Sequence, residues 1–243
     1  MRRQCDRTRA RAPWACGIGL MLSSAASALS SAVSAELPHA PPPAVWPDTF
    51  LARVEALALL ETFKDELLTH DSATATLEHW CDVHQLASPA SIIAERMPLE
   101  KPLAPEHRRE LRIGRAESVR YRRVRLRCGP MVLSEADNWY VPARLTTEMN
   151  RQLDHSDAPF GKVVQELHFQ RRTLSSELLW RPLSEGWEMM PAVAGNPAAA
   201  LVIPHALLEH RALLTLADGT PISEVVETYT SDILAFPVSL PQP

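Results

Sequence analysis

Two segments with the pattern of β-hairpins limit most strongly the folds open to this chain. In residues 116–142, β-branched and aromatic side chains flank a Cys-Gly-Pro turn at 128–130, and Pro142 ends the second strand. In residues 210–229, two apolar runs flank an Ala-Asp-Gly-Thr turn at 217–220. Because a hairpin pairs its strands antiparallel, we expect an antiparallel sheet.

Helical patterns precede these hairpins. In residues 49–69 apolar side chains recur at steps of three and four, which predicts an amphipathic helix. A second helix is expected to follow the N-cap residues Asp71 and Ser72 and to run to about His84. Prolines recur in residues 85–107 and in residues 181–200. We therefore predict that 85–107 is mostly loop and that 181–200 is an irregular excursion. Residues 144–153 are helical in character. Helices followed by strands predict an α+β fold.

Residues 1–35 have the features of an export signal. Arginines precede Trp14, no charge occurs from there to Ala35, and small residues end the segment before Glu36. We therefore expect cleavage before Glu36, a proline-rich spacer at 36–48 and one domain at 49–243. The protein would be periplasmic or secreted and without a stable membrane span, with an uncleaved cytoplasmic chain as the alternative.

Cleavage would change the charge of the chain. It would remove five Arg and one Asp and take the formal charge from −4 to −8. Proteins that bind nucleic acid usually have a basic excess, so we expect no nucleic-acid partner. Glycine is scarce, with 8 residues against 21 Pro, and the sequence has no glycine-rich phosphate loop. We therefore expect no nucleotide, and no other cofactor.

The mature chain would keep two cysteines, Cys81 and Cys128. In an oxidising compartment they form either one disulfide or two buried thiols, and the sequence leaves both open. His79, Cys81 and His84 resemble metal ligands. On a helix, however, positions i and i+2 point nearly opposite ways, and no further pair completes a set. We expect no metal site.

Arginines alternate with apolar residues in residues 119–127. The apolar face of Val124 and Leu126, extended backwards, includes Arg122 and Arg120. An Arg that faces inward must find an anion, and a carboxylate ligand fits because the guanidinium binds it in two-pronged fashion. The alternate arginines, at 123, 125 and 127, are expected to be solvated.

The last strand carries two glutamates on different faces. Ile222, Glu224 and Val226 share one face, and Val225 and Glu227 the other. A Glu between apolar neighbours is either an outward-facing residue or a site carboxylate with a raised pKa. The pattern leaves both interpretations of Glu224 open.

Five stretches of the chain share one order with the segments of a known family. They are LLTHDSAT at 67–74, RRVRL at 122–126, APFGK at 158–162, EHRALL at 209–214 and PISE at 221–224. In this order they resemble the chorismate lyase family, whose enzymes convert chorismate to 4-hydroxybenzoate and pyruvate. The similarity extends over about residues 50–234. Export and the excursion at 181–200 mark the chain as a sister group of the enzymes.

The resemblance implies a six-stranded antiparallel sheet with helices on one face, enclosing a ligand pocket, in a chain expected to be monomeric. It implies that Arg122 binds the ring carboxylate of the substrate, or that Arg123 does so if the turn differs by one residue. It gives Glu224 the catalytic position near the ring hydroxyl and the enolpyruvyl ether, and it places Ala73 and Gly161 in the pocket wall.

Two functions follow from the resemblance. The first is a carbon–oxygen lyase that removes pyruvate from chorismate, or acts on a related aromatic or cyclohexadiene carboxylate. Loss of the enolpyruvyl group makes the ring aromatic, so orientation and acid–base help suffice for such a reaction. The alternative is a non-catalytic periplasmic protein that binds small aromatic acids on the same fold.

Overall fold

The computed structural model describes residues 46–114, 117–192 and 195–236. The predicted signal at 1–35 and most of the predicted spacer lie outside these residues. The described part of the spacer is packed: Trp46 is buried and its Nε1 donates to the carbonyl of Leu234 at 3.1 Å. Pro47 forms a bridge to Ala200.

The predicted helices at the start of the domain are confirmed. Helix α1 (Phe50–Thr69) is capped by Thr49, whose hydroxyl accepts from the Ala52 amide at 3.1 Å. Its buried side begins with Ala52 and Ala56. Helix α2 (Ala73–Val83) is capped by Ser72, as predicted.

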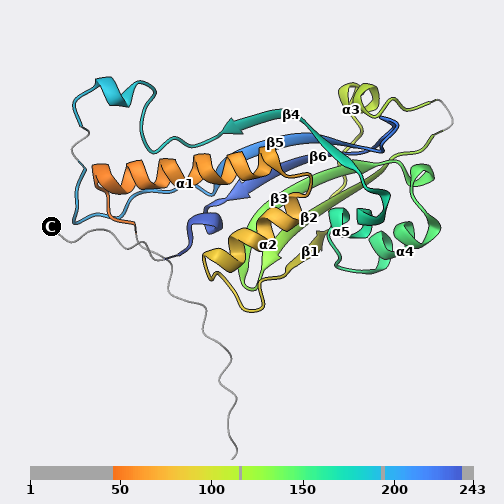
Figure 1. Ribbon diagram of the computed structural model, residues 1–243, viewed down its shortest axis with the longest axis horizontal. Helices are drawn as coiled ribbons and strands as arrows, with labels where there is room; N and C mark the ends of the chain where they lie inside the picture. Colours follow the sequence, from red (N-terminus) through yellow and green to blue (C-terminus); the bar gives the residue numbers. More distant parts are fainter. Residues whose placement is uncertain (1–45, 115–116, 193–194, 237–243) are drawn as a thin grey trace, which may run out of the picture. The chain divides into compact units, whose positions relative to one another are not determined.

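The six strands of the described sheet are antiparallel neighbours in the order β1-β2-β3-β6-β5-β4 (Figure 1). The hairpins predicted at the two turns are confirmed. The strands are β1 (Ile92–Met97), β2 (Arg120–Cys128), β3 (Met131–Tyr140), β4 (Gln170–Leu178), β5 (Ala206–Thr215) and β6 (Pro221–Thr230). The α+β class and the six-stranded antiparallel sheet are therefore as expected.

One segment differs from the sequence-based expectation. Residues 85–107, predicted to be mostly loop, contain β1 and the start of helix α3 (Pro105–Glu110). The burial of β1 alternates only at Ile92, Ile93 and Ala94, because this edge strand pairs with β2 alone. The described residues of the excursion, 181–192 and 195–200, are irregular as predicted, apart from the short turn η3 (Trp187–Met189).

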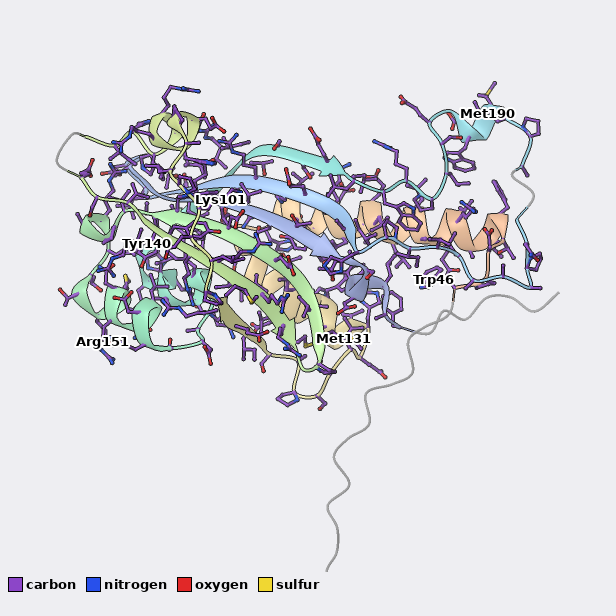
Figure 2. The ribbon with its side chains drawn as sticks, turned by 180° about the vertical axis from the view of Figure 1, so that it is seen from behind. Trp46, Lys101, Met131, Tyr140, Arg151 and Met190 are labelled. Atoms are coloured by element: carbon purple, nitrogen blue, oxygen red, sulfur yellow. A yellow bond between two sulfur atoms is a disulfide. The ribbon has the colours of Figure 1, made fainter. Side chains whose placement is uncertain are left out.

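Helices α1 and α2 cover one face of the sheet, and Figure 2 shows the opposite face from behind. Helix α3 packs on this opposite face, where His107 stacks on Trp139 with ring centroids 3.9 Å apart. Leu111, Trp139 and Leu213 form a small separate core there. The main core lies between the sheet and α1 and α2.

The remaining elements connect the strands. They are the turn η1 (Pro142–Arg144), the helices α4 (Thr147–His155) and α5 (Phe160–Val163), and the turns η2 (Gln165–Leu167) and η4 (Ser231–Leu234). Within the residues that the structure describes, no helix is both long and apolar enough to cross a membrane.

Candidate functional site

A pocket lies between the covered face of the sheet and the segments that begin α2 and α5. Its space not filled by atoms is about 520 Å³, including the open mouth. The floor comes from β2, β3, β5 and β6, and the walls from residues 71–74, 159–161, Phe169 and Arg171. The residues that line the floor are Arg122, Val124, Leu126, Ala136, Asn138, Leu214, Val225 and Glu227. Most of this floor is apolar, so it suits an apolar part of a ligand.

Strand register explains which side chains reach the floor. Arg122 on β2 pairs with Asn138 on β3, which pairs with Val225 on β6. Residues directly opposite one another in a sheet point to the same face. The next row on this face holds Val124, Ala136 and Glu227. Arg122 and Glu227 therefore face the same pocket from strands separated by β3.

Arg122 is a buried cation without an acidic partner. The residue is 5% exposed, and its Nη2 donates to the Ala158 carbonyl at 3.1 Å. Its Nε is buried without a hydrogen-bond partner, and none of the described carboxylates forms an ion pair with it. Burial and the nearby Arg96 lower the pKa of Arg122 to about 10, so it stays protonated at neutral pH. An uncompensated buried charge is costly, and an anionic ligand would relieve that cost.

The start of helix α2 adds to the positive potential of the pocket. Ser72, Ala73 and Thr74 line the pocket, and Ser72 caps the helix by accepting from the Ala75 amide at 3.2 Å. The first amides of a helix carry a partial positive charge that favours anions. The helix start and Arg122 thus favour the same kind of ligand.

The opposite side of the pocket holds a paired cation. Arg171 on β4 donates to Glu227 on β6, and both side chains are 5% exposed. Tyr229 donates to the same Glu227 oxygen, Oε2, at 3.0 Å. Burial and the charge of Glu227 raise the pKa of Tyr229 well above its usual value, which keeps this donor protonated. Glu227 Oε1 has no hydrogen-bond partner among the described residues, so it is available as an acceptor.

Three of the predicted site residues meet at this pocket: Arg122, Ala73 and Gly161. A β-carbon on Gly161 would lie 3.4 Å from Thr74 Oγ1, so a side chain there would fill the wall. Arg123 lies on the other face of the sheet, where it donates to Asp137 and Glu135 at 2.8 Å each. Of the two adjacent arginines, Arg122 is the one in the pocket.

Glu224 is not among the residues that line the pocket. The prediction that Glu224 is the carboxylate of the site is therefore wrong. It is fully buried on the opposite face, where Arg211 donates to its Oε1 at 2.6 Å and His107 Nδ1 lies 2.9 Å from the same oxygen. Residues 224 and 227 are an odd number apart on one strand and therefore face opposite sides. The carboxylate in the pocket is that of Glu227.

Sequence reasoning missed Glu227, Arg171 and Asn138 as pocket residues. The period of the strand placed Glu227 on one face with Val225 and Tyr229. Both faces of β6 are buried and largely apolar in sequence, so the pattern did not show which face lines the pocket. Arg171 lies on an edge strand whose side chains are mostly half-buried, and its pattern carries little signal. Its long side chain reaches the pocket from there.

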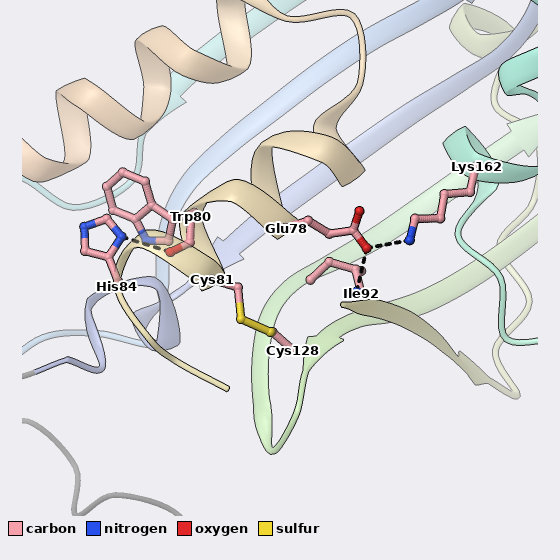
Figure 3. The surroundings of a disulfide bond; sticks show 7 residues. All are labelled: Glu78, Trp80, Cys81, His84, Ile92, Cys128 and Lys162. Atoms are coloured by element: carbon pink, nitrogen blue, oxygen red, sulfur yellow. Dashed lines mark hydrogen bonds and ion pairs between the residues drawn. A yellow bond between two sulfur atoms is a disulfide. The ribbon is translucent and has the colours of Figure 1, made fainter. Parts of the chain in front are cut away.

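A disulfide joins helix α2 to the sheet, which both contribute residues to the pocket. It links Cys81 on α2 to Cys128 at the end of β2 (Figure 3). Nearby, Glu78 of α2 accepts from the Ile92 amide at 3.0 Å and from Lys162 at 2.5 Å. Of the two states left open by the sequence, the structure contains the disulfide. Cys81 is thus not a metal ligand, and the described residues contain no group of three His, Cys, Asp or Glu placed to hold a metal ion.

Comparisons with solved structures give only distant similarity. PhnF from Mycobacterium smegmatis matches with a TM-score of 0.40 and 11% identity, over 72% of this chain and 71% of that one. The possible transcriptional regulator YydK from Bacillus subtilis matches with a TM-score of 0.36 and 18% identity, over 61% and 62%. TM-scores this low carry no argument, so the fold is assigned from the order and pairing of the six strands described above.

Comparison with curated sequences gives a much closer relative. No family model matches the chain. A protein of Sinorhizobium fredii, named "Uncharacterized protein y4mC", is 50% identical over 200 residues, which cover 82% of this chain and 84% of that protein. Identity at this level over most of both chains means a shared family and fold. The chain belongs to the same family as the Sinorhizobium fredii protein y4mC.

Proposed function

We propose that the protein binds a small aromatic monocarboxylate, such as a hydroxybenzoate, with Arg122 as the partner of the carboxylate. The observation that carries the proposal is the burial of the Arg122 guanidinium, 5% exposed, without a carboxylate partner among the described residues. A planar carboxylate matches the guanidinium donors in geometry and charge. The start of α2 lies in the same pocket and favours the same anion.

The charges of the pocket favour one carboxylate over two. Arg171 is paired with Glu227, which leaves Arg122 as the unpaired cation among the described pocket residues. Asp71, also at the pocket, is exposed, so solvent screens its charge. A second carboxylate on the ligand would lack a free cation. A neutral donor such as a phenol hydroxyl would instead meet the free oxygen of Glu227.

The apolar floor fits the ring between these two ends. Val124, Leu126, Ala136 and Val225 line it, and each is buried. A ring placed on them loses contact with water, which stabilises the complex by about 25 cal/mol for each Å² of apolar surface. Pocket shape and charge thus describe a ligand with an acid at one end, a ring, and a hydrogen-bond donor at the other.

Calorimetric titration of the purified full chain tests this function. We expect 4-hydroxybenzoate to bind with a Kd in the micromolar range. The neutral analogue 4-hydroxybenzamide is the control, and we expect it to bind at least about tenfold more weakly because it forms no ion pair with Arg122. Undetectable binding of 4-hydroxybenzoate at millimolar concentration would exclude the proposed function.

Lyase activity on chorismate is the second candidate. Arg122 and Glu227 face one pocket, which supports the pairing of an Arg with a Glu of the closing hairpin that the family resemblance implies. Chorismate carries two carboxylates, so the charge argument places this candidate second. Incubation with chorismate, with 4-hydroxybenzoate and pyruvate measured together, separates the two. Equimolar products above the spontaneous rate would establish the lyase, and binding without products would establish the binder.

We also propose that the chain is exported and cleaved before Glu36. The disulfide between Cys81 and Cys128 supports this proposal, because stable disulfides are typical of oxidising compartments. N-terminal sequencing of the protein from fractionated cells tests it. We expect Glu36 as the first residue in the periplasmic or secreted fraction. An intact Met1 in the cytoplasmic fraction would exclude export.

A further inference from the structure

Asn138 places a polar group on the otherwise apolar middle of the pocket floor. It lies on β3, directly between Arg122 on β2 and Val225 on β6, and it lines the pocket. The residue is 5% exposed. Buried side-chain amides nearly always have hydrogen-bond partners, because an unpaired one costs about 1 to 3 kcal/mol.

The orientation of the Asn138 amide is set by Ser223. The Ser223 hydroxyl, fully buried on β6, donates to Asn138 Oδ1 at 2.7 Å. This bond turns Oδ1 towards Ser223 and leaves Nδ2 as a donor. Nδ2 has no hydrogen-bond partner in the described parts of the chain, although the neighbouring Oδ1 has one. A donor without an acceptor therefore faces the pocket beside Arg122.

We propose that Asn138 Nδ2 donates to the carboxylate of the ligand next to Arg122, and that Asn138 selects acids over neutral groups. The inference rests on the proposed binding of an aromatic carboxylate in this pocket. Facing residues of an antiparallel pair have Cα atoms about 5 Å apart, so one carboxylate can accept from both side chains through its two oxygens. Ser223 acts as a positioning residue because it touches the amide and not the ligand.

Replacement of Asn138 by Asp tests the selection. The new carboxylate would pair with Arg122 and repel a ligand acid, while it would accept from the NH2 of an amide. We expect Asn138→Asp to weaken binding of 4-hydroxybenzoate by about tenfold or more and to bind 4-hydroxybenzamide more tightly than the wild type does. A general folding defect would weaken both ligands, so opposite changes show that the side chain at position 138 meets the acid or amide end of the ligand.

Two further variants complete the experiment. Ser223→Ala frees the amide to rotate, and we expect about a threefold to fivefold loss for 4-hydroxybenzoate, with no added change in selectivity when combined with Asn138→Asp. Asn196→Asp is the matched control, because it adds the same charge in the irregular excursion, where, among the described residues, the hydrogen bond of its side chain is the one that Oδ1 accepts from the Ala198 amide. We expect this control to bind both ligands as the wild type does.

The outcomes separate this inference from the function on which it rests. If the wild type binds 4-hydroxybenzoate and Asn138→Asp leaves the ratio of the two affinities unchanged, the role of Asn138 is excluded while the proposed function stands. A parallel loss of both ligands in a folded Asn138→Asp variant also excludes selection by this residue. If the wild type does not bind 4-hydroxybenzoate, both proposals fail.

Discussion

Glu227 and Glu224 lie on the same strand, β6, and each pairs with an arginine on a different face of the sheet. Glu227 binds Arg171 at the pocket, and Glu224 binds Arg211 beneath helix α3. Both carboxylates are buried, so local burial does not distinguish them. Their opposite directions follow from the alternation of side chains along a strand.

Neutralising these two glutamates should have different effects on ligand choice. Glu227→Gln leaves Arg171 as a second unpaired cation in the pocket. We expect this variant to gain affinity for benzene-1,4-dicarboxylate, relative to 4-hydroxybenzoate, by about tenfold. Glu224→Gln removes an equal charge on the opposite face and should leave that ratio unchanged. Calorimetry with both ligands measures the ratio of the two affinities in each variant. The same ratio in Glu227→Gln and Glu224→Gln would contradict the charge argument.

The period of the strands was enough to predict the face of Arg122. Val124 and Leu126 are buried at the pocket, and Arg122 shares their face as expected. The same period separated Glu224 from Glu227 correctly, but it gave no sign of which face encloses the pocket. Helix α3 buries the face of Glu224, and the sequence had assigned that region to loop. The choice between the two glutamates required the tertiary structure.

Edge strands account for the other missed elements. Strands β1 and β4 form the two edges of the sheet, and many of their side chains are half-buried or exposed. Such strands show weak alternation, in contrast to the central strands β3 and β6, which are mostly buried. The sequence likewise left the state of Cys81 and Cys128 undecided, because their pairing depends on the docking of α2 against the end of β2.

Removal of the disulfide should destabilise the domain. The bond closes a loop between residues 47 positions apart. The entropy of closing such a loop corresponds to about 4 kcal/mol of stability. We expect Cys81→Ser combined with Cys128→Ser to lower the free energy of unfolding by roughly that amount in urea titrations. Wild-type protein unfolded under a strong reductant is the control, and it should lose a similar amount. No change in either sample would show that the bond does not constrain the unfolded chain.

Acid should destabilise the protein through His210. This side chain is fully buried next to the Arg171–Glu227 pair, and its Nε2 lies 3.0 Å from Thr173 Oγ1. Burial, and then the charge of Arg171, lower the pKa of His210 to about 4. The unfolded chain takes up this proton near pH 6.5, so the unfolded state binds more protons between the two pKa values. The contribution of His210 to stability is therefore fully present above pH 6.5 and is lost as the pH drops towards 4.

Urea unfolding at pH 7.5 and pH 5 measures this contribution. We expect His210 to account for about 2 kcal/mol of the loss between these two values. His210→Gln should reduce the loss by that amount, whereas His205→Gln, at an exposed position, should not. The pKa of His84 is also lowered by burial, but this residue stays unchanged in both variants. An equal pH dependence in wild type and His210→Gln would contradict the assignment.

The central claim is that Arg122 binds the carboxylate of the ligand, and its sequence neighbour provides the matched control. Arg122 lines the pocket and has no acidic partner among the described residues, while Arg123 is paired with Asp137 and Glu135 on the other face. Titration of 4-hydroxybenzoate into Arg122→Ala and Arg123→Ala compares two variants with the same change in charge. We predict that Arg122→Ala weakens binding by about a hundredfold and Arg123→Ala by less than about threefold. Equal affinities in Arg122→Ala and the wild type would contradict the account.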